Sequence, residues 1–420
     1  MTAARSTALL AQRPALRPDL LISRPMLRGP APVHLIKDPR SGRRFEVRAK
    51  EHFILERLDG RRTLAQIGDE YAVHFGARLG EPQWQQLLRV AYGRGLMADA
   101  PPPPAEPAPA EPAPGKKPSG FLSGTVKLVH DAPIFIEHLH RATAFVRKRY
   151  LLGALALGML AMTADLAADY GELVRDAAKL IAEPSVLLAV LTLLWTSYAL
   201  HELGHGVAGR AFGAAVSEIG LRWHYGMVLM YCRVEDVQFF ARRRDQVIVA
   251  AAGVFVNLLI LLPFWVAWLA CPPGGSARRL LGGLLLLGMA AALVNLLPLP
   301  PLDGYLALGY ALGVSRLATE SNTFLKLAAA RVVRRGKGAG GYPARLRVLY
   351  AAYGTLSYAL ALGLAAAAVL VSRHMLIDHF GRSAGVVPVA LVASAVALWA
   401  IGLAAAGSRR RTQANRRAAG

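Results

Sequence analysis

The sequence predicts a mostly α-helical protein: a polytopic membrane helix bundle of about six spans, preceded by a small α+β soluble domain. Two observations predict the bundle. The 420-residue chain is 54% hydrophobic, and its apolar residues gather into runs of about 17 to 25 residues, the length that crosses a bilayer. Lys and Arg collect in alternate loops between these runs, the pattern that the positive-inside rule describes. The soluble domain is predicted by shorter alternating and helical patterns near the N-terminus.

The formal net charge of +22 is compatible with two classes of partner, nucleic acids and membranes. The basic residues follow the loops between apolar runs instead of forming one patch. We therefore expect a lipid bilayer as a partner of the chain and no nucleic acid.

The N-terminal region divides into a tail and a small domain. Residues 1–30 are predicted to be a disordered tail, because arginines and prolines alternate there without an apolar stretch long enough for a secretory signal. Residues 31–99 form the predicted domain. It begins with a β-hairpin, because Val33–Ile36 and Arg44–Val47 alternate around the turn Asp38–Gly42.

Three short helices are predicted to follow the hairpin. The first spans Ala49–Leu58, and the second begins after an N-cap at Thr63 and ends before Gly76. The third begins near Glu81 and runs to Gly95. A hairpin and three helices within about seventy residues predict a winged-helix-like domain.

Two connecting segments separate this domain from the bundle. Residues 100–119 are a Pro-rich linker, whose composition favours an extended polyproline spacer. Residues 120–149 mix apolar side chains with His and Arg, which predicts an interfacial segment that leads into the first span.

The membrane domain is predicted to occupy residues 150–408, followed by a basic cytoplasmic tail at 409–420. The loop charges place both termini in the cytoplasm. The six predicted spans are Tyr150–Ala168, Pro184–His205, Gln246–Ala270, Leu280–Leu302, Val348–Val371 and Val386–Ala406.

The second span ends in the motif His201-Glu202-Leu-Gly-His205. On a helix the two histidines lie four residues apart on one face, so both imidazoles can bind one metal ion. Glu202 lies beside them, where a carboxylate can act as a general base. Ionisable groups at the end of an apolar helix are expensive, which favours a functional role over chance.

A catalytic zinc site usually has a third protein ligand. His224, Glu235 and Asp236 follow the motif in the next loop and are candidates. Asp303 is favoured over them, because it lies at the end of the fourth span, which antiparallel threading brings to the level of His201.

Two stretches together carry a resemblance to a known family. His201-Glu202-Leu-Gly-His205, with Asn295-x-x-Pro298-x-Pro300-x-x-Asp303-Gly304 downstream, resembles the site-2 protease family of intramembrane zinc metalloproteases over a core at residues 184–312. The resemblance implies one Zn²⁺ per chain, held by His201, His205 and Asp303, with Glu202 as the catalytic residue. It also implies that Asn257 and Asn295 support the substrate strand or the oxyanion. The chain departs from the family at Val254, where proline is usual.

The N-terminal domain carries a looser resemblance. Its hairpin, the stretch Leu58–Thr63 and the closing Gly93–Met97 are similar to PqqD-like domains, which bind leader peptides of ribosomally made, modified peptides. The resemblance implies a leader peptide as a partner of this domain. A winged helix used for docking or DNA contact is the alternative.

These features predict a multi-pass integral protein of a bacterial plasma membrane. We expect a membrane-embedded zinc endopeptidase that hydrolyses a peptide or membrane-anchored protein at the cytoplasmic membrane edge, in maturation or export of a ribosomally made peptide. The alternatives are a regulatory intramembrane protease of a signalling protein, and a non-catalytic peptide-binding, export or immunity component on the same fold. Ser217–Phe240 is either a hairpin that presents a β edge to the substrate or a loop anchored by aromatic residues.

Overall fold

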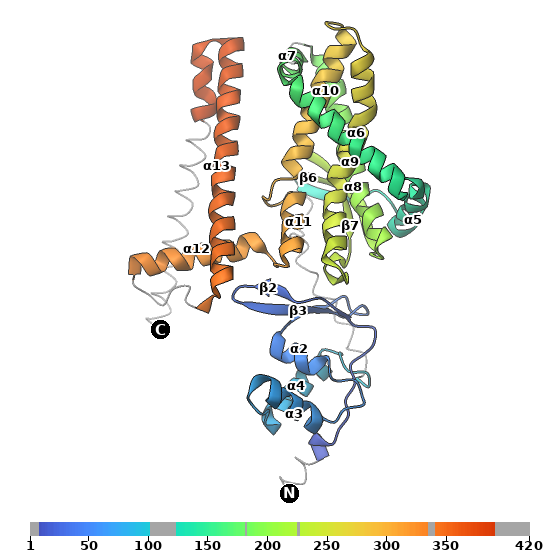
Figure 1. The fold of residues 1–420 in the computed structure, drawn as a ribbon, viewed down its shortest axis with the longest axis vertical. Coiled ribbons are helices and arrows are strands. Elements are labelled where there is room, and N and C mark those ends of the chain that lie inside the picture. Colours follow the sequence, from blue (N-terminus) through green and yellow to red (C-terminus); the bar gives the residue numbers. More distant parts are fainter. Residues whose placement is uncertain (1–7, 101–122, 181–182, 225–226, 335–340, 391–420) are drawn as a thin grey trace. The chain divides into compact units, whose positions relative to one another are not determined.

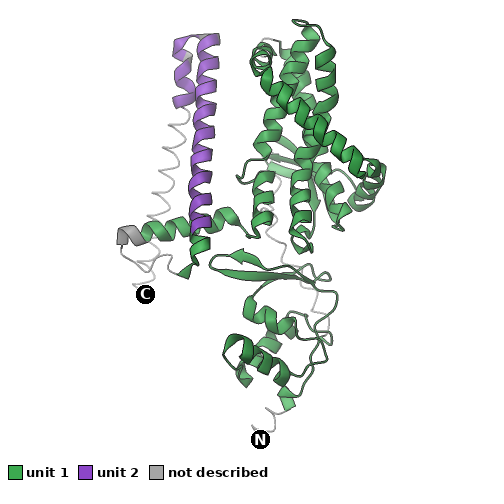
Figure 2. Cartoon of the chain, in the orientation of Figure 1, with its two compact units in different colours: residues 1–347 green, residues 348–420 purple. Residues whose placement is uncertain are grey.

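The computed structural model describes residues 8–100, 123–180, 183–224, 227–334 and 341–390. The chain divides into two units, residues 1–347 and 348–420 (Figure 2). Unit 2 contains the part of α13 (Ala344–Phe380) from Val348 onward and the short helix η4 (Arg382–Val386). The site and all contacts discussed below lie in unit 1.

The described part of the chain is mostly helical, as predicted, and contains five helices long and apolar enough to cross a membrane. These spans are α6 (Arg149–Ala168), α8 (Pro184–Ala211), α9 (Arg243–Ala270), α10 (Ser276–Asn295) and Ala344–Asp378 of α13. The sixth predicted span, Val386–Ala406, lies largely outside the described residues.

The front domain, residues 8–100, has the predicted hairpin and three helices (Figure 1). Strands β3 (Ala31–Lys37) and β4 (Arg44–Arg48) pair antiparallel, and the helices α2 (Ala49–Leu55), α3 (Leu64–Phe75) and α4 (Glu81–Gly93) follow. Helix α3 begins with a capping box, because the Thr63 hydroxyl accepts from the Gln66 amide while the Gln66 side chain accepts from the Thr63 amide. One core formed by the hairpin and the helices includes Ile36, Leu64, Ile67 and Trp84.

The segment before the hairpin differs from the predicted disordered tail. Strands β1 (Leu21–Ile22) and β2 (Met26–Arg28) both pair with β3. Upstream of them, the Leu16 amide donates to the Leu58 carbonyl at 2.8 Å and the Arg17 amide donates to the Leu96 carbonyl at 3.0 Å. The disorder prediction was therefore wrong for residues 8–28, whose backbone partners lie far along the chain.

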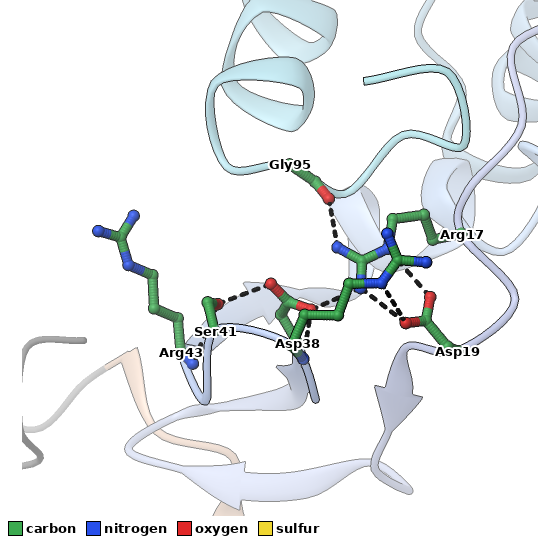
Figure 3. Close-up of polar contacts among 7 residues, drawn as sticks. Arg17, Asp19, Asp38, Ser41, Arg43 and Gly95 are labelled. Atoms are coloured by element: carbon green, nitrogen blue, oxygen red, sulfur yellow. Dashed lines mark hydrogen bonds and ion pairs between the residues drawn. The ribbon is translucent and has the colours of Figure 1, made fainter. Parts of the chain in front are cut away.

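Arg17 fixes this segment through its side chain as well (Figure 3). Its guanidinium is 4% exposed and lies 2.6 Å from a carboxylate oxygen of Asp38, whose side chain is fully buried. The same group donates to both carboxylate oxygens of Asp19 and to the Gly95 carbonyl. Arg17 thus joins the N-terminal segment, the hairpin turn and the end of α4.

A second sheet lies against the membrane helices. Strands β5 (Ser123–Lys127), β6 (Val216–His224) and β7 (Met227–Val234) pair antiparallel in that order. The predicted hairpin at 217–240 is confirmed as β6 and β7. The segment 120–149, predicted to be interfacial, contributes β5 and also α5 (Ala132–Ala142), whose buried Ile136 packs under β6.

Helix α9 is the central packing element of the bundle. It contacts α6, α8, α10 and α11 (Asp303–Leu312), while α7 (Tyr170–Leu180) packs on α10. The fourth predicted span, Leu280–Leu302, is wrong at its end, because α10 stops at Asn295 and the chain turns before α11. The cause is the run Pro298-Leu-Pro300-Pro301, since proline lacks the amide hydrogen that a continuing helix requires. Helix α12 (Leu317–Arg334) follows α11.

Candidate metal centre

Helix α8 brings the two histidines of the motif together. The His201 ring is 3% exposed and the His205 ring 14%. Their Nε2 atoms lie 3.2 Å apart, with the ring planes nearly perpendicular. Both nitrogens therefore face the same small volume on one side of α8.

Asp303, the first residue of α11, completes a triangle of ligand atoms. Its Oδ2 lies 2.9 Å from His201 Nε2 and 3.3 Å from His205 Nε2. Tetrahedral zinc with ligands at about 2.0 to 2.1 Å separates neighbouring ligand atoms by about 3.3 Å. The observed edges of 2.9, 3.2 and 3.3 Å are close to that value. Of the described residues, only these three form a group able to hold a metal ion.

The buried Oδ2 of Asp303 has no hydrogen-bond partner among the described residues. An unpaired buried carboxylate oxygen carries a large desolvation cost. It lies beside two ring nitrogens, and a cation placed between the three atoms would satisfy all of them. The residues present therefore fit a zinc ion by donor type, number and spacing.

Each imidazole has a partner at its Nδ1 atom, on the far side of the ring from Nε2. The Val249 carbonyl lies 2.7 Å from His205 Nδ1, and because a carbonyl only accepts, the proton is on Nδ1 and the Nε2 lone pair is free. The side-chain amide of Asn257 lies 3.0 Å from His201 Nδ1. The contacting atom of Asn257 is its side-chain nitrogen, and its carbonyl oxygen accepts a hydrogen bond from the Ser197 hydroxyl at 3.2 Å.

The two asparagines predicted to support the substrate or oxyanion occupy different places. Asn257 is 6% exposed and contacts the His201 ring, so its observed contact is with a candidate metal ligand. Asn295 ends α10, is half-buried and makes no side-chain hydrogen bond among the described residues. The substrate or oxyanion contact of both asparagines stays a prediction.

Glu202 faces the sheet. Its Oε2 accepts a hydrogen bond from the Cys232 amide of β7 at 3.2 Å. Burial first, and then the Glu202 carboxylate, raise the pKa of the Cys232 thiol to about 12. Cys232 is therefore a neutral thiol at neutral pH.

Strand β7 turns one edge toward α8. The Trp195 indole donates to the Val228 carbonyl at 2.8 Å, while the Cys232 amide donates to Glu202. Backbone groups of alternate residues point to the same edge of a strand. The amide and carbonyl of Met230, midway between those two residues, therefore also point to the edge that faces α8.

Sequence reasoning missed the glycines that make room for the ligands. A Cβ atom at Gly253 of α9 would overlap the His201 ring, and one at Gly304 of α11 would overlap the Leu296 carbonyl. Gly253 thus admits the His201 ring, and Gly304 lets α11 begin close to the end of α10 and so places Asp303. Tyr198 was also missed, although its ring stacks on that of His201 with centroids 5.6 Å apart. Its position one helical turn before His201 was the available signal.

The alternative third ligands are not brought into the triangle. Glu235 lies 3.3 Å from Arg44, and Asp236 accepts from Lys37 through both carboxylate oxygens at 2.8 Å. Both acids thus pair with the front domain. The side chain of His224 is outside the described part of the structure.

Comparisons with protein-family models, with curated proteins and with solved structures gave no match.

Proposed function

We propose that this chain is a membrane-embedded zinc endopeptidase. The observation that carries the proposal is the convergence of His201 Nε2, His205 Nε2 and Asp303 Oδ2, with the last of these buried and without a hydrogen bond. The resemblance of the same residues to site-2 proteases supports it. So does the apolar character of α8, which carries the histidines and is long enough to span a bilayer.

The metal ion, Glu202 and the partners of the two histidines have different roles in the proposed peptide hydrolysis. Zinc, when bound, supplies a Lewis acid that activates water at neutral pH and polarises a carbonyl. Glu202, next to His201, takes the proton from the attacking water and delivers it to the leaving amine. The Val249 carbonyl holds the His205 imidazole in the tautomer that leaves Nε2 free, and Asn257 contacts the His201 ring at Nδ1.

The edge of β7 supports a peptide substrate. The backbone groups of Met230 point toward α8. On either side of Met230, the Val228 carbonyl and the Cys232 amide already have hydrogen-bond partners on α8. An extended peptide that pairs with Met230 would gain backbone hydrogen bonds and lie beside Glu202. A substrate segment from a membrane helix would unwind before it could pair in this way.

The front domain supports a precursor peptide as the substrate class. Its hairpin and three helices match the element order of PqqD-like domains, for which leader peptides are the partner. Its Lys37 and Arg44 pair with Asp236 and Glu235, the residues that directly follow β7. Recognition of a leader and cleavage of the attached peptide would thus take place on linked elements.

Zinc content and hydrolysis measured on one variant test this proposal. The purified chain should contain about one zinc per chain. Glu202→Gln should retain that zinc while losing hydrolysis of a library of synthetic transmembrane peptides, monitored by mass spectrometry, by about 10² to 10⁴-fold. Hydrolysis that survives in Glu202→Gln would refute the proposed base. A metal-free preparation whose properties do not change with chelator would instead favour the non-catalytic alternative.

A further inference from the structure

A cavity of about 490 Å³ lies where the front domain meets the ends of α9 and α11. This volume lies within the range of small-molecule sites, about 300 to 1,000 Å³. Strands β2 and β4 contribute one side, and α9, α11 and the loop after α11 contribute the other. The polar residues that line it include Arg24, Arg28, Arg44, Arg243, Gln246 and Arg316.

The charge of the cavity is strongly unbalanced. Five arginines line it, and Glu46 is the one acid among its lining residues. Arg28 pairs with Glu46, and Arg44 pairs with Glu235. By contrast, no carboxylate of the described residues lies within 4.0 Å of the guanidinium groups of Arg24, Arg243 and Arg316. Three positive charges thus remain for a ligand.

Gln246 supplies a second, independent observation. It is 5% exposed, lines the cavity, and its amide makes no hydrogen bond with any described group. The little surface that Gln246 exposes faces the cavity, so its amide is available to hydrogen-bond a ligand or water there. The hydroxyl of Tyr310, which also lines the cavity, is likewise unpartnered within the described residues. These polar groups join the arginines in facing an acceptor-rich ligand.

The position of the cavity indicates where an anion would come from. Arg243 is the first residue of α9, a helix long enough to cross a membrane, and the end of a spanning helix lies near the phospholipid headgroups. Leu306, another lining residue, is 44% exposed and offers an apolar surface beside the charged one. Both features suit a phosphate that carries acyl chains better than a freely soluble anion.

We propose that this cavity binds the phosphate headgroup of an anionic phospholipid. Arg24 would contact it from the front domain, Arg243 from the start of α9 and Arg316 from the loop after α11, with Gln246 as a neutral donor. The bound headgroup would therefore hold the two parts together. Backbone bonds already join them at the rim, because the Leu27 amide donates to the Gly313 carbonyl at 2.7 Å and the Ser315 amide donates to the Leu27 carbonyl at 2.9 Å.

Two double variants with equal charge changes test the site on the full chain. Arg24→Gln with Arg316→Gln removes two cavity charges. Arg242→Gln with Arg244→Gln removes two exposed charges that neighbour Arg243 in sequence but do not line the cavity. Binding of short-chain phosphatidylglycerol to detergent-solubilised protein should weaken about tenfold or more in the cavity double and change less than about threefold in the control. If both double variants lost the same affinity for phosphatidylglycerol, the binding would come from general attraction between basic residues and the lipid. That result would overturn the proposal.

Competition against labelled phosphatidylglycerol identifies the source of the anion. Phosphatidylglycerol should displace a labelled copy of itself, whereas phosphatidylcholine, glycerol phosphate and a poly-glutamate peptide should fail at equal concentration. Glycerol phosphate competing equally well would assign the cavity to a soluble phosphate. A poly-glutamate peptide competing better would assign it to an acidic peptide. Either result overturns the lipid assignment.

Gln246→Met separates binding from folding. Replacing an unpartnered buried amide with an apolar side chain of similar size should leave the melting temperature in phosphatidylcholine unchanged, while the affinity for phosphatidylglycerol falls. In the wild type, phosphatidylglycerol should slow hydrogen exchange at the Leu27 amide, and in the cavity double it should not. Because Glu202→Gln should bind the lipid like the wild type, failure here is distinguishable from failure of the proposed protease.

Discussion

A buried carboxylate oxygen without a hydrogen bond makes Asp303 the residue on which the candidate metal centre most depends. The two histidines come from adjacent turns of α8 and would stay in place without it. We expect Asp303→Ala to reduce bound zinc from about one per chain to below about a tenth, measured by elemental mass spectrometry after dialysis. Glu235→Ala is the matched control and should retain its zinc, because Glu235 pairs with Arg44. Zinc that is lost from Glu235→Ala and kept in Asp303→Ala would point to the other ligand set.

The contact between Asn257 and His201 gives a second test at the residue scale. Asn257→Ala leaves His201 Nδ1 without its partner in a site where the ring is 3% exposed. We expect zinc affinity to fall by about 10 to 100-fold, because such supporting groups orient the ligand. Competition with a chromophoric chelator measures this without reference to catalysis. Asn295→Ala, which removes no observed side-chain hydrogen bond, should leave the affinity within about twofold.

The N-terminal segment, as an element, depends on Arg17. Arg17→Met would leave Asp38 buried with one ionic partner removed, and we expect the front domain to lose about 3 kcal/mol of stability. Hydrogen exchange of peptides from residues 31–97 in the full chain measures that loss. Arg40→Gln is the control, because Arg40 is 63% exposed and its pairing with Asp19 should contribute at most about 0.5 kcal/mol.

The same network predicts a pH dependence for the front domain. Burial alone would raise the pKa of Asp38, but hydrogen bonds from Ser41, Arg17 and the Arg40 amide lower it below its ordinary value. The hydrogen bond from Arg17 lowers the pKa of Asp19 to about 2. Because unfolded aspartates titrate near about 3.9, the stability from both groups is complete above about pH 4 and is lost as the pH falls toward about 2. Arg17→Met should flatten this slope, and a slope as steep as that of the wild type would contradict it.

Elements with a local signal were predictable from the sequence, and those that depend on distant partners were not. The capping box at Thr63, the hairpin around Asp38–Gly42 and the apolar spans all have local patterns. Residues 8–28 do not, because their order comes from carbonyls at Leu58 and Leu96. Strand β5 likewise pairs with β6 about a hundred residues later, which no local pattern reveals.

In the candidate site, too, features with a local sequence signal were predictable and those that depend on distant partners were not. The spacing of His201 and His205 is a helical periodicity, so sequence alone placed both rings on one face. The convergence with Asp303 was inferred from the threading of antiparallel spans, and the structure brings the three atoms together. The roles of Asn257 and Gly253 were not accessible, because both depend on how α9 packs against α8, which periodicity does not specify.

At the scale of the whole chain, the front domain's contacts reach both elements that frame the site. Lys37 and Arg44 pair with acids at the end of β7, whose edge faces Glu202. Leu27 bonds to the loop that follows α11, the helix that begins with Asp303. A change in how the front domain docks would therefore act on the strand edge and on a metal ligand together. This linkage is a physical route by which binding of a leader peptide would influence cleavage.

Reversing the charges of one ion pair tests that linkage. Arg44→Glu places like charges opposite Glu235 and Asp236, and we expect the Leu27 amide to exchange about three to tenfold faster as the bond to Gly313 opens more often. Adding Glu235→Arg restores an opposite-charge pair and should recover most of the protection. Raising the salt concentration from about 0.1 to 1 M should speed exchange in the wild type and slow it in Arg44→Glu, because screening weakens the attraction in the first and the repulsion in the second. Unchanged exchange in Arg44→Glu would mean that the backbone bridge at Leu27 holds the front domain without the ion pairs, and coupling to the site would then run through α11 alone.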